Sequence, residues 1–138
     1  MLYLLKRIFI FLLPSGVIRT KWIEKWKIFN STGKNFYFCP RKIPADPKLI
    51  KFKDNVAVAT DVMFINHDVS QKVFNSIFDE DVPKFFGCIE VGNNVFIGAK
   101  SIILPNVKIC DNVYIAAGAV VAKSITESGI WGGVLLNV

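Results

Sequence analysis

Aliphatic residues recur at every sixth position through the last third of the chain. The members of this series are Val91, Ile97, Ile103, Ile109, Ile115 and Val121. Small or β-branched residues follow each of them four positions later, at Val95, Ser101, Val107, Val113, Ala119 and Ile125. Neither the 3.6-residue period of a helix nor the alternation of a strand gives two interlocked series of period six. A chain that turns a corner every six residues does, so the pattern predicts a stacked coil.

Three such segments complete one coil, so each residue is expected to stack on its counterpart three segments later. Val91 is matched in kind by Ile109, and the polar pair Asn93-Asn94 is matched by Asp111-Asn112. Asparagine and aspartate tolerate the left-handed backbone that a tight corner requires. These pairs are therefore predicted to form the corners of the coil.

A less regular copy of the repeat precedes the clean one. Between residues 35 and 66 the six-residue interval holds at Phe52, Val58 and Phe64. From His67 to about Gly87 it is lost, and the sequence becomes polar and mixed in charge. Long loops in compact domains are usually functional. This stretch is predicted to be a loop extruded from the coil.

The segment from Met1 to Phe29 is predicted to be helical, with a break near Pro14-Ser15-Gly16. One face of its second half is apolar and holds Ile18, Trp22, Trp26 and Phe29. Basic residues, including Arg19, Lys21, Lys25 and Lys27, are expected on the remaining surface. Two interpretations stay open: a basic amphipathic helix on a membrane interface, or a helix that packs its tryptophans on its own domain or a neighbouring subunit. We prefer the second.

Composition narrows the choice of partner and compartment. The net charge is +6, and most of the positive charge precedes residue 54, which suits an anionic ligand or a membrane surface. No nucleic-acid-binding motif accompanies it, so a nucleic-acid partner is not expected. The three cysteines share no metal-ligand spacing and predict reduced thiols in a cytoplasm.

The apolar stretch from Met1 to Leu13 does not predict a membrane span or a secretion signal. It carries Lys6 and Arg7 and stops at Pro14, whereas a spanning helix needs about 20 apolar residues. No cleavage site of the Ala-x-Ala kind follows it. A cytoplasmic protein is therefore expected, either free or peripheral to the inner face of the membrane.

The repeat carries a family resemblance. Its clean part reads IEVGNNVFIGAKSIILPNVKICDNVYIAAGAVVAKSI from Ile89 to Ile125. This run resembles the hexapeptide-repeat acetyltransferases, in particular those that modify maltose, galactosides and capsular polysaccharides. The resemblance implies an all-β chain, a left-handed parallel β-helix of hexapeptide repeats with a short helical N-terminal segment and one extruded loop. The expected divisions are a helical, basic segment at 1–34 and a β-helix acyltransferase domain at 35–138, with the loop at 67–87.

The only histidine of the chain, His67, stands where the irregular repeat ends and the loop begins. A zinc carbonic anhydrase of this fold would need three histidine ligands, so no metal is expected. A lone imidazole can instead take a proton from a sugar hydroxyl, which then attacks the thioester of acetyl-CoA. The resemblance gives His67 this role of general base and implies direct transfer. The alternative is a structural histidine that caps a corner.

The same resemblance assigns further contacts. It places Phe96 against the acceptor or the pantetheine arm. Asp68 follows His67, but neighbours along a strand point to opposite faces, so it is expected to contact the acceptor, or a neighbouring subunit, rather than to orient the imidazole. Small or basic residues are expected to bind the acetyl-CoA co-substrate, namely Gly98, Ala99, Ala117, Ala122 and Lys123. Bulky side chains would block the pantetheine arm, and a lysine suits phosphate. Tight packing between coils is the alternative reason for the small residues.

Two departures from the family pattern bear on activity. The usual Pro-Ala-Lys type of ending is replaced by GIWGGVLLNV, and the asparagine that assists the oxyanion aligns near Cys39. The preferred prediction is a homotrimeric, CoA-dependent O-acetyltransferase that acts on a saccharide, with its active site between subunits. A lipid-linked acceptor would bring residues 1–29 to the membrane surface. The alternatives are a non-catalytic β-helix that binds or assembles, and an N-acetyltransferase of an amino sugar.

Overall fold

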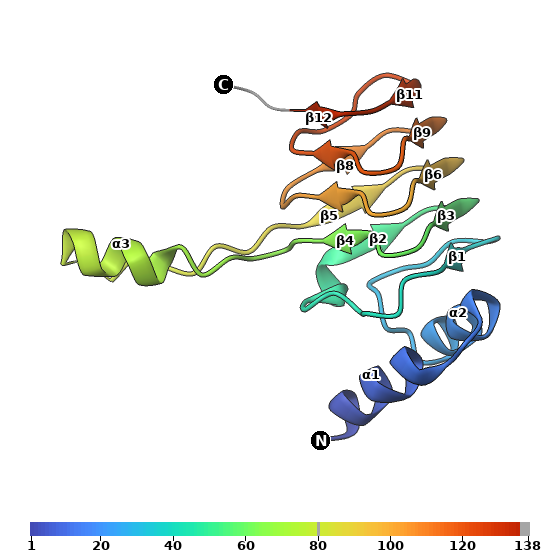
Figure 1. Ribbon diagram of the computed structural model, residues 1–138, viewed down its shortest axis with the longest axis horizontal. Coiled ribbons are helices and arrows are strands. Elements are labelled where there is room, and N and C mark those ends of the chain that lie inside the picture. The colour runs from blue at the N-terminus through green and yellow to red at the C-terminus, as the bar shows by residue number, and fades with distance from the viewer. Residues whose placement is uncertain (80, 136–138) are drawn as a thin grey trace.

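The chain winds into a three-sided parallel β-helix whose first end is covered by two helices (Figure 1). A computed structural model describes residues 1–79 and 81–135. Glu80, within the predicted loop, and residues 136–138, the end of the predicted coil domain, lie outside the described residues. Each turn of the chain passes through three parallel sheets in the same order.

The strands are short because each fills one flat side of a coil. The first sheet contains β2 (Ile50–Phe52), β5 (Ile89–Val91) and β8 (Lys108–Ile109). The second sheet contains β1 (Tyr37–Phe38), β3 (Val56–Val58), β6 (Val95–Ile97), β9 (Val113–Ile115) and β11 (Gly129–Trp131). The third sheet contains β4 (Met63–Phe64), β7 (Ile102–Ile103), β10 (Val120–Val121) and β12 (Val134–Leu135). We call the turn after each sheet the first, second and third corner respectively.

The predicted stacking of every third segment is confirmed. Ile97 lies beside Ile115 in the second sheet, and Ile103 lies beside Val121 in the third. All six aliphatic residues of the series are at most 1% exposed, because each points into the prism. Their burial stabilises the fold by roughly 1.5–3 kcal/mol for each side chain. The aliphatic series is therefore the hydrophobic core of the coil.

The coil extends beyond the clean repeat at both ends. The irregular copy stacks in register, with Phe52 beside Val91 in the first sheet. After Ile125 the chain makes a further turn through β11 and β12. The six-residue interval does not extend into this last turn, because the turn contains fewer residues than the others. Ile115 pairs with Trp131, whereas a full repeat would pair it with Gly133.

The expected all-β class is too narrow. The described residues contain three α-helices, α1 (Leu2–Leu12), α2 (Gly16–Lys25) and α3 (Gln71–Phe78), and one short 3₁₀-helix, η1 (Pro47–Leu49). The first two meet at the predicted break and close the start of the coil. Phe38 donates its backbone N–H to Thr20 Oγ1 at 2.8 Å. Strand β1 lies at the edge of its sheet with no further coil beside it, so α2 supplies the acceptor that a neighbouring strand would otherwise provide. The helices are thus part of the coil's end, not an appendage.

Arginine side chains fasten α1 and α2 to the first coil. Arg7 donates to the carbonyl oxygens of Ile43 and Pro44, and Arg41 donates to those of Phe11 and Leu13. Arg19, which the sequence places off the apolar face of the helix, is 3% exposed and donates to backbone oxygens of both segments. It is buried because the helix turns its small and polar side toward the coil, where unpaired carbonyls need donors.

The predicted aromatic face is divided between two places. Trp22 and Trp26 pack on Phe9 of α1, with ring centroids 5.1 and 5.5 Å away. Phe29 was expected on the same helical face, but the helix ends at Lys25 and the Phe29 ring is 2% exposed in the coil core. The tryptophans therefore join the two helices of one chain. Within the described residues, no helix is long and apolar enough to cross a membrane.

Asparagines stack along the first corner. Asn35, Asn55, Asn94 and Asn112 all have a positive φ, between 53° and 60°. Each amide donates to the side-chain oxygen of the next asparagine, at 2.6 to 2.9 Å. This confirms the predicted corners, and the hydrogen bonds join successive coils.

Replacing Asn94 separates the two functions of this ladder. Asn94→Ala should lower the free energy of unfolding by about 1–2 kcal/mol, because alanine loses the ladder hydrogen bonds and resists the left-handed conformation. Asn94→Gly should recover part of the loss, since glycine accepts a positive φ without strain. Urea titration of both variants measures the difference. Equal losses would show that backbone strain contributes nothing at this corner.

Candidate active site

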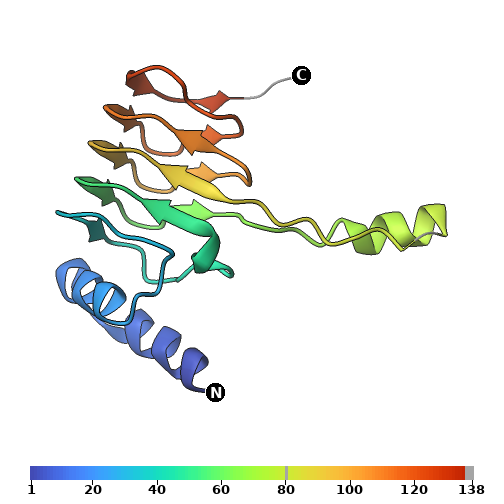
Figure 2. The same cartoon turned by 180° about the vertical axis from the view of Figure 1, so that it is seen from behind.

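His67 lies at the base of an arm that leaves the coil at its third corner. The arm runs out from Asn66 and returns at Gly87, and these residues are joined by a backbone hydrogen bond of 2.6 Å. His67 and Phe86 form an antiparallel bridge one step further out. Figures 1 and 2 show the arm projecting from the side of the prism with α3 at its end. The folded coil and the arm together fix the backbone of His67.

A carboxylate holds the imidazole. Nδ1 of His67 hydrogen-bonds to Oδ2 of Asp46, and each side chain is about one-third exposed. A carboxylate only accepts hydrogen bonds, so Nδ1 is the donor, and in the neutral imidazole the lone pair is on Nε2. The Phe86 ring lies 5.5 Å from the imidazole, centroid to centroid, and limits its movement. This arrangement fixes the direction of Nε2, which is what the predicted role of general base requires.

Sequence reasoning missed Asp46. It lies just before η1, in the coil that precedes His67, and 21 residues separate the two. The acidic residue beside His67 in the sequence is Asp68, whereas the coil brings the partner of the imidazole from one turn earlier. An acidic residue about one coil upstream of the histidine is the signal that would have found it.

Asp46→Asn tests whether this pair acts in catalysis. The amide is nearly isosteric but cannot stabilise a protonated imidazole, so kcat should fall by about tenfold to a hundredfold. KM for acetyl-CoA should stay the same, because the family resemblance assigns acetyl-CoA to other residues. Steady-state kinetics with both substrates varied measures the two constants. An unchanged kcat would reduce Asp46 to a structural residue.

Asp68 is engaged with its own segment. Its Oδ1 accepts hydrogen bonds from the hydroxyl and the backbone N–H of Ser70, at 2.6 and 3.0 Å. These bonds hold the pKa of Asp68 below its ordinary value. They also brace the turn that leads into α3. Asp68 does not contact the imidazole nitrogen that Asp46 occupies, and its predicted contact with an acceptor remains a prediction.

Phe96 points outward from the second sheet. Its ring stacks on that of Tyr114, in the next coil, with centroids 4.8 Å apart. Ile130 continues the same row and is 82% exposed. An apolar strip thus follows the coil axis on this face. In one protomer the strip lies on a different side of the prism from the third corner, where His67 stands.

The small residues that are predicted to line the co-substrate site are small for different structural reasons. A Cβ on Gly98 would lie 2.5 Å from the backbone nitrogen of Ala117, so glycine is required there by the packing of one coil on the next. Ala99 and Ala117 stack at the second corner, and a Cβ on the adjacent Gly118 would meet nothing within 4 Å. That corner is therefore smooth and open.

Ala122 and Lys123 lie on the third corner, as His67 does, but two coils further along the axis. Strands in neighbouring coils are about 4.8 Å apart, so this is a separation of roughly 10 Å along the axis. Lys123 is exposed. The structure thus brings Lys123 to the same edge as His67, while Ala99 and Ala117 occupy the other edge of the third sheet.

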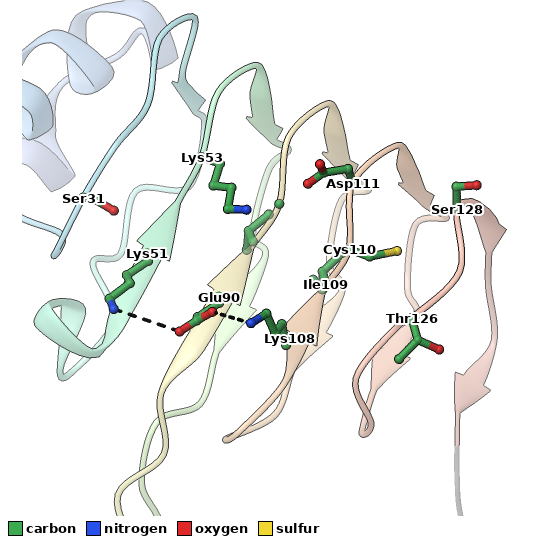
Figure 3. Close-up of a pocket in the computed structure, with 12 residues that line it drawn as sticks. Ser31, Lys51, Lys53, Glu90, Lys108, Ile109, Cys110, Asp111, Thr126 and Ser128 are labelled. Carbon is green, nitrogen blue, oxygen red and sulfur yellow. Dashed lines mark ion pairs between the residues drawn. The ribbon is translucent and has the colours of Figure 1, made fainter.

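A separate hollow of about 650 Å³ lies on the outer face of the first sheet (Figure 3). Glu90 crosses it between Lys108, at 3.2 Å, and Lys51, at 4.0 Å. The hydrogen bond and charge of Lys108 hold the pKa of Glu90 below its ordinary value. Exposed ion pairs of this kind add little stability. Neither His67 nor Asp46 lines this hollow.

Cys39, which aligns near the family's oxyanion residue, lies after β1 at the second corner. Its sulfur is 3.2 Å from Thr60 Oγ1. Burial raises the pKa of this thiol, but contacts with Thr60, Tyr37 and Arg19 outweigh that effect and lower it. Within one protomer Cys39 and His67 belong to different corners. Among the described residues, no cluster of three or more His, Cys, Asp or Glu side chains is arranged to hold a metal ion.

These observations define the class. A three-sided parallel β-helix of six-residue segments is the architecture of the hexapeptide-repeat proteins. The family described as "Bacterial transferase hexapeptide (six repeats)" matches residues 89–123. The chain belongs to the hexapeptide-repeat acetyltransferase family.

Individual relatives agree with this assignment. Galactoside O-acetyltransferase of Escherichia coli K12 is 33% identical over 124 residues, which are 85% of this chain and 59% of the relative. The crystal structure of a maltose O-acetyltransferase from Clostridium difficile 630 has 26% identity and a TM-score of 0.68, over 94% of this chain and 78% of the other.

A hexapeptide-repeat acetyltransferase from Vibrio cholerae O1 biovar eltor, solved with acetyl coenzyme A, shares the fold. Its identity is 16% and its TM-score is 0.65, over 93% of this chain and 78% of the other. The chain spans between 51% and 60% of the length of the curated relatives that it matches over most of its own length.

Proposed function

We propose that this protein transfers the acetyl group of acetyl-CoA to a hydroxyl group of a saccharide. The observation that carries the proposal is the His67–Asp46 pair, an oriented base at the foot of the arm. The relatives named for galactosides and maltose support a sugar as the acceptor. The structure with acetyl coenzyme A, which has the same fold, supports the donor.

The proposed reaction is a direct transfer. Nε2 of His67 takes the proton of the sugar hydroxyl as its oxygen attacks the carbonyl carbon of the thioester. The tetrahedral intermediate then collapses, the carbon–sulfur bond breaks, and the thiolate of CoA receives the proton from the imidazolium. Asp46 stabilises the positive charge that His67 carries between these steps. No other reactant is required.

The proposed active site lies between copies of the chain in a homotrimer. The base and Lys123 occupy the third corner, whereas the smooth edge at Ala99 and Ala117 is the second corner. The third sheet separates these two edges within one protomer, so they can meet only when the edge of one copy faces that of another. We assign Lys123 to the phosphates of CoA and the small residues to its pantetheine arm. The coil is proposed to be left-handed, as the family resemblance implies.

The arm is proposed to shape the choice of acceptor. It starts at His67, the proposed general base, and it carries exposed side chains at Phe85 and Phe86. Aromatic faces pack against sugar rings. Since acetyl-CoA is a cytoplasmic metabolite, we place the reaction in the cytoplasm.

A panel of acceptors tests the proposal. Release of the CoA thiol is measured with galactosides, maltose and glucosamine, and the product is analysed for an ester or an amide. An ester from a hydroxyl acceptor is the expected result. A faster reaction at the amine of glucosamine would make the protein an N-acetyltransferase. Failure with every acceptor, together with undetectable binding of acetyl-CoA, would favour a non-catalytic assembly module.

A further inference from the structure

The outer side of α1 is apolar and uncovered. Among the residues of α1, all of them described, only Ile10 is buried. Leu5, Ile8 and Leu12 follow one another at three- and four-residue intervals, so they share one side of the helix. They are 56%, 48% and 70% exposed. A continuous exposed apolar surface of this kind marks a contact with a partner or a membrane.

Positive charge lies beside this apolar surface. The segment from Met1 to Ile23 contains no acidic residue. The ammonium group of Lys6 lies 5.3 Å from the centre of the Trp26 ring, and that of Lys25 lies 4.7 Å from the centre of the Trp22 ring. Tryptophan and lysine are the residues that anchor proteins at the boundary between hydrocarbon and lipid headgroups. Their charge attracts anionic lipids.

The position of the helix leaves this surface free. α1 and α2 cover the end of the prism, away from its three sheet faces, in both views of the molecule (Figures 1 and 2). Copies that pack side by side through those faces or their edges leave the end of each prism outside the contact. With 11 residues, α1 is about 16 Å long, too short to cross a hydrocarbon core of about 30 Å.

We propose that α1 binds the surface of an anionic lipid bilayer, lying in the plane of the interface with Leu5, Ile8 and Leu12 in the acyl boundary. The basic residues around it contact the lipid headgroups. Helices with this distribution of apolar and basic side chains bind in that manner. The inference rests on α1 and its neighbours alone and is independent of acetyl transfer.

Co-sedimentation of the full chain with vesicles tests the inference. The vesicles contain phosphatidylcholine with or without phosphatidylglycerol. Wild type should sediment with the anionic vesicles and be released by added salt. Leu5→Asp with Leu12→Asp should weaken partitioning by at least about tenfold, because each leucine contributes apolar burial worth that factor. Lys21→Glu with Lys25→Glu should weaken it as well, and the exposed leucines and isoleucine of α1 are unchanged in that variant.

The matched control lies on α3. Val73 and Ile77 are 59% and 64% exposed, so Val73→Asp with Ile77→Asp makes the same chemical change on another apolar helix. This control should sediment like wild type, and circular dichroism should give all variants the same melting temperature. Three results would overturn the inference: no sedimentation of wild type, unchanged sedimentation of both α1 and lysine variants, or loss in the α3 variant alone. A smaller oligomer for the α1 variant without vesicles would also overturn it, by assigning the surface to contact between copies.

Discussion

His67→Ala is expected to lower kcat by a factor of about 10² to 10⁴, the usual contribution of a general base. His67 is the only histidine, and the described structure gives its Nδ1 a single partner, Asp46. Without the imidazole, the acceptor hydroxyl would have to lose its proton to water. The binding of acetyl-CoA should be unchanged, because it uses other residues in the proposed site. Single-turnover kinetics and CoA titration measure the two quantities.

Two further measurements make this result specific. Added imidazole should restore part of the activity of His67→Ala, because a small base can enter the space left by the side chain. Thermal unfolding should show a folded protein that loses about 1–3 kcal/mol of stability, the effect of removing one charged hydrogen bond. A variant that keeps the full wild-type rate would remove His67 from the mechanism and with it the proposed reaction.

The second large effect concerns stability. Phe52→Ala should lower the free energy of unfolding by about 3–5 kcal/mol, a large part of the roughly 5–15 kcal/mol typical of a domain. Phe52 is 1% exposed and its ring packs on those of Phe29, Phe36 and Phe64, with centroids 4.8 to 5.7 Å apart. This cluster joins the first coils to the segment that follows α2. Chemical denaturation followed by tryptophan fluorescence measures the loss.

Phe74→Ala is the control for that experiment. Phe74 lies on α3 and is 42% exposed, so the same truncation should change the free energy of unfolding by about 0.5 kcal/mol or less. Equal effects of the two substitutions would mean that the aromatic cluster adds nothing beyond a generic loss of side-chain volume.

Most of the coil could be predicted because its core is local in sequence. One aliphatic residue on each flat side, such as Ile97 or Ile103, is enough to define the period. The helix α3 was missed although Val73, Phe74, Ile77 and Phe78 recur at helical spacing, because the loss of the six-residue interval was interpreted as a loop. The six-residue interval does not extend into the last coil because its turns are shorter, as the pairing of Ile115 with Trp131 shows.

The site was only partly predictable. His67 stood out because the chain has no second histidine, and its placement at the start of the arm followed from the end of the repeat. Asp46 could not be recognised from proximity in sequence, because contacts in a solenoid join residues one turn apart. Gly98 was assigned to the co-substrate, yet the close approach of the next coil explains why it is glycine.

The arm is an insertion that leaves the strand pairing between successive coils unchanged. Val91 pairs with Phe52 on one side and with Ile109 on the other, although the first partner is more than twice as far away along the chain. The extra length leaves and re-enters at one corner, between Asn66 and Gly87. Selection can therefore lengthen, shorten or exchange this segment without moving any inward-facing residue. Changes in substrate preference and conservation of the scaffold become separate evolutionary problems.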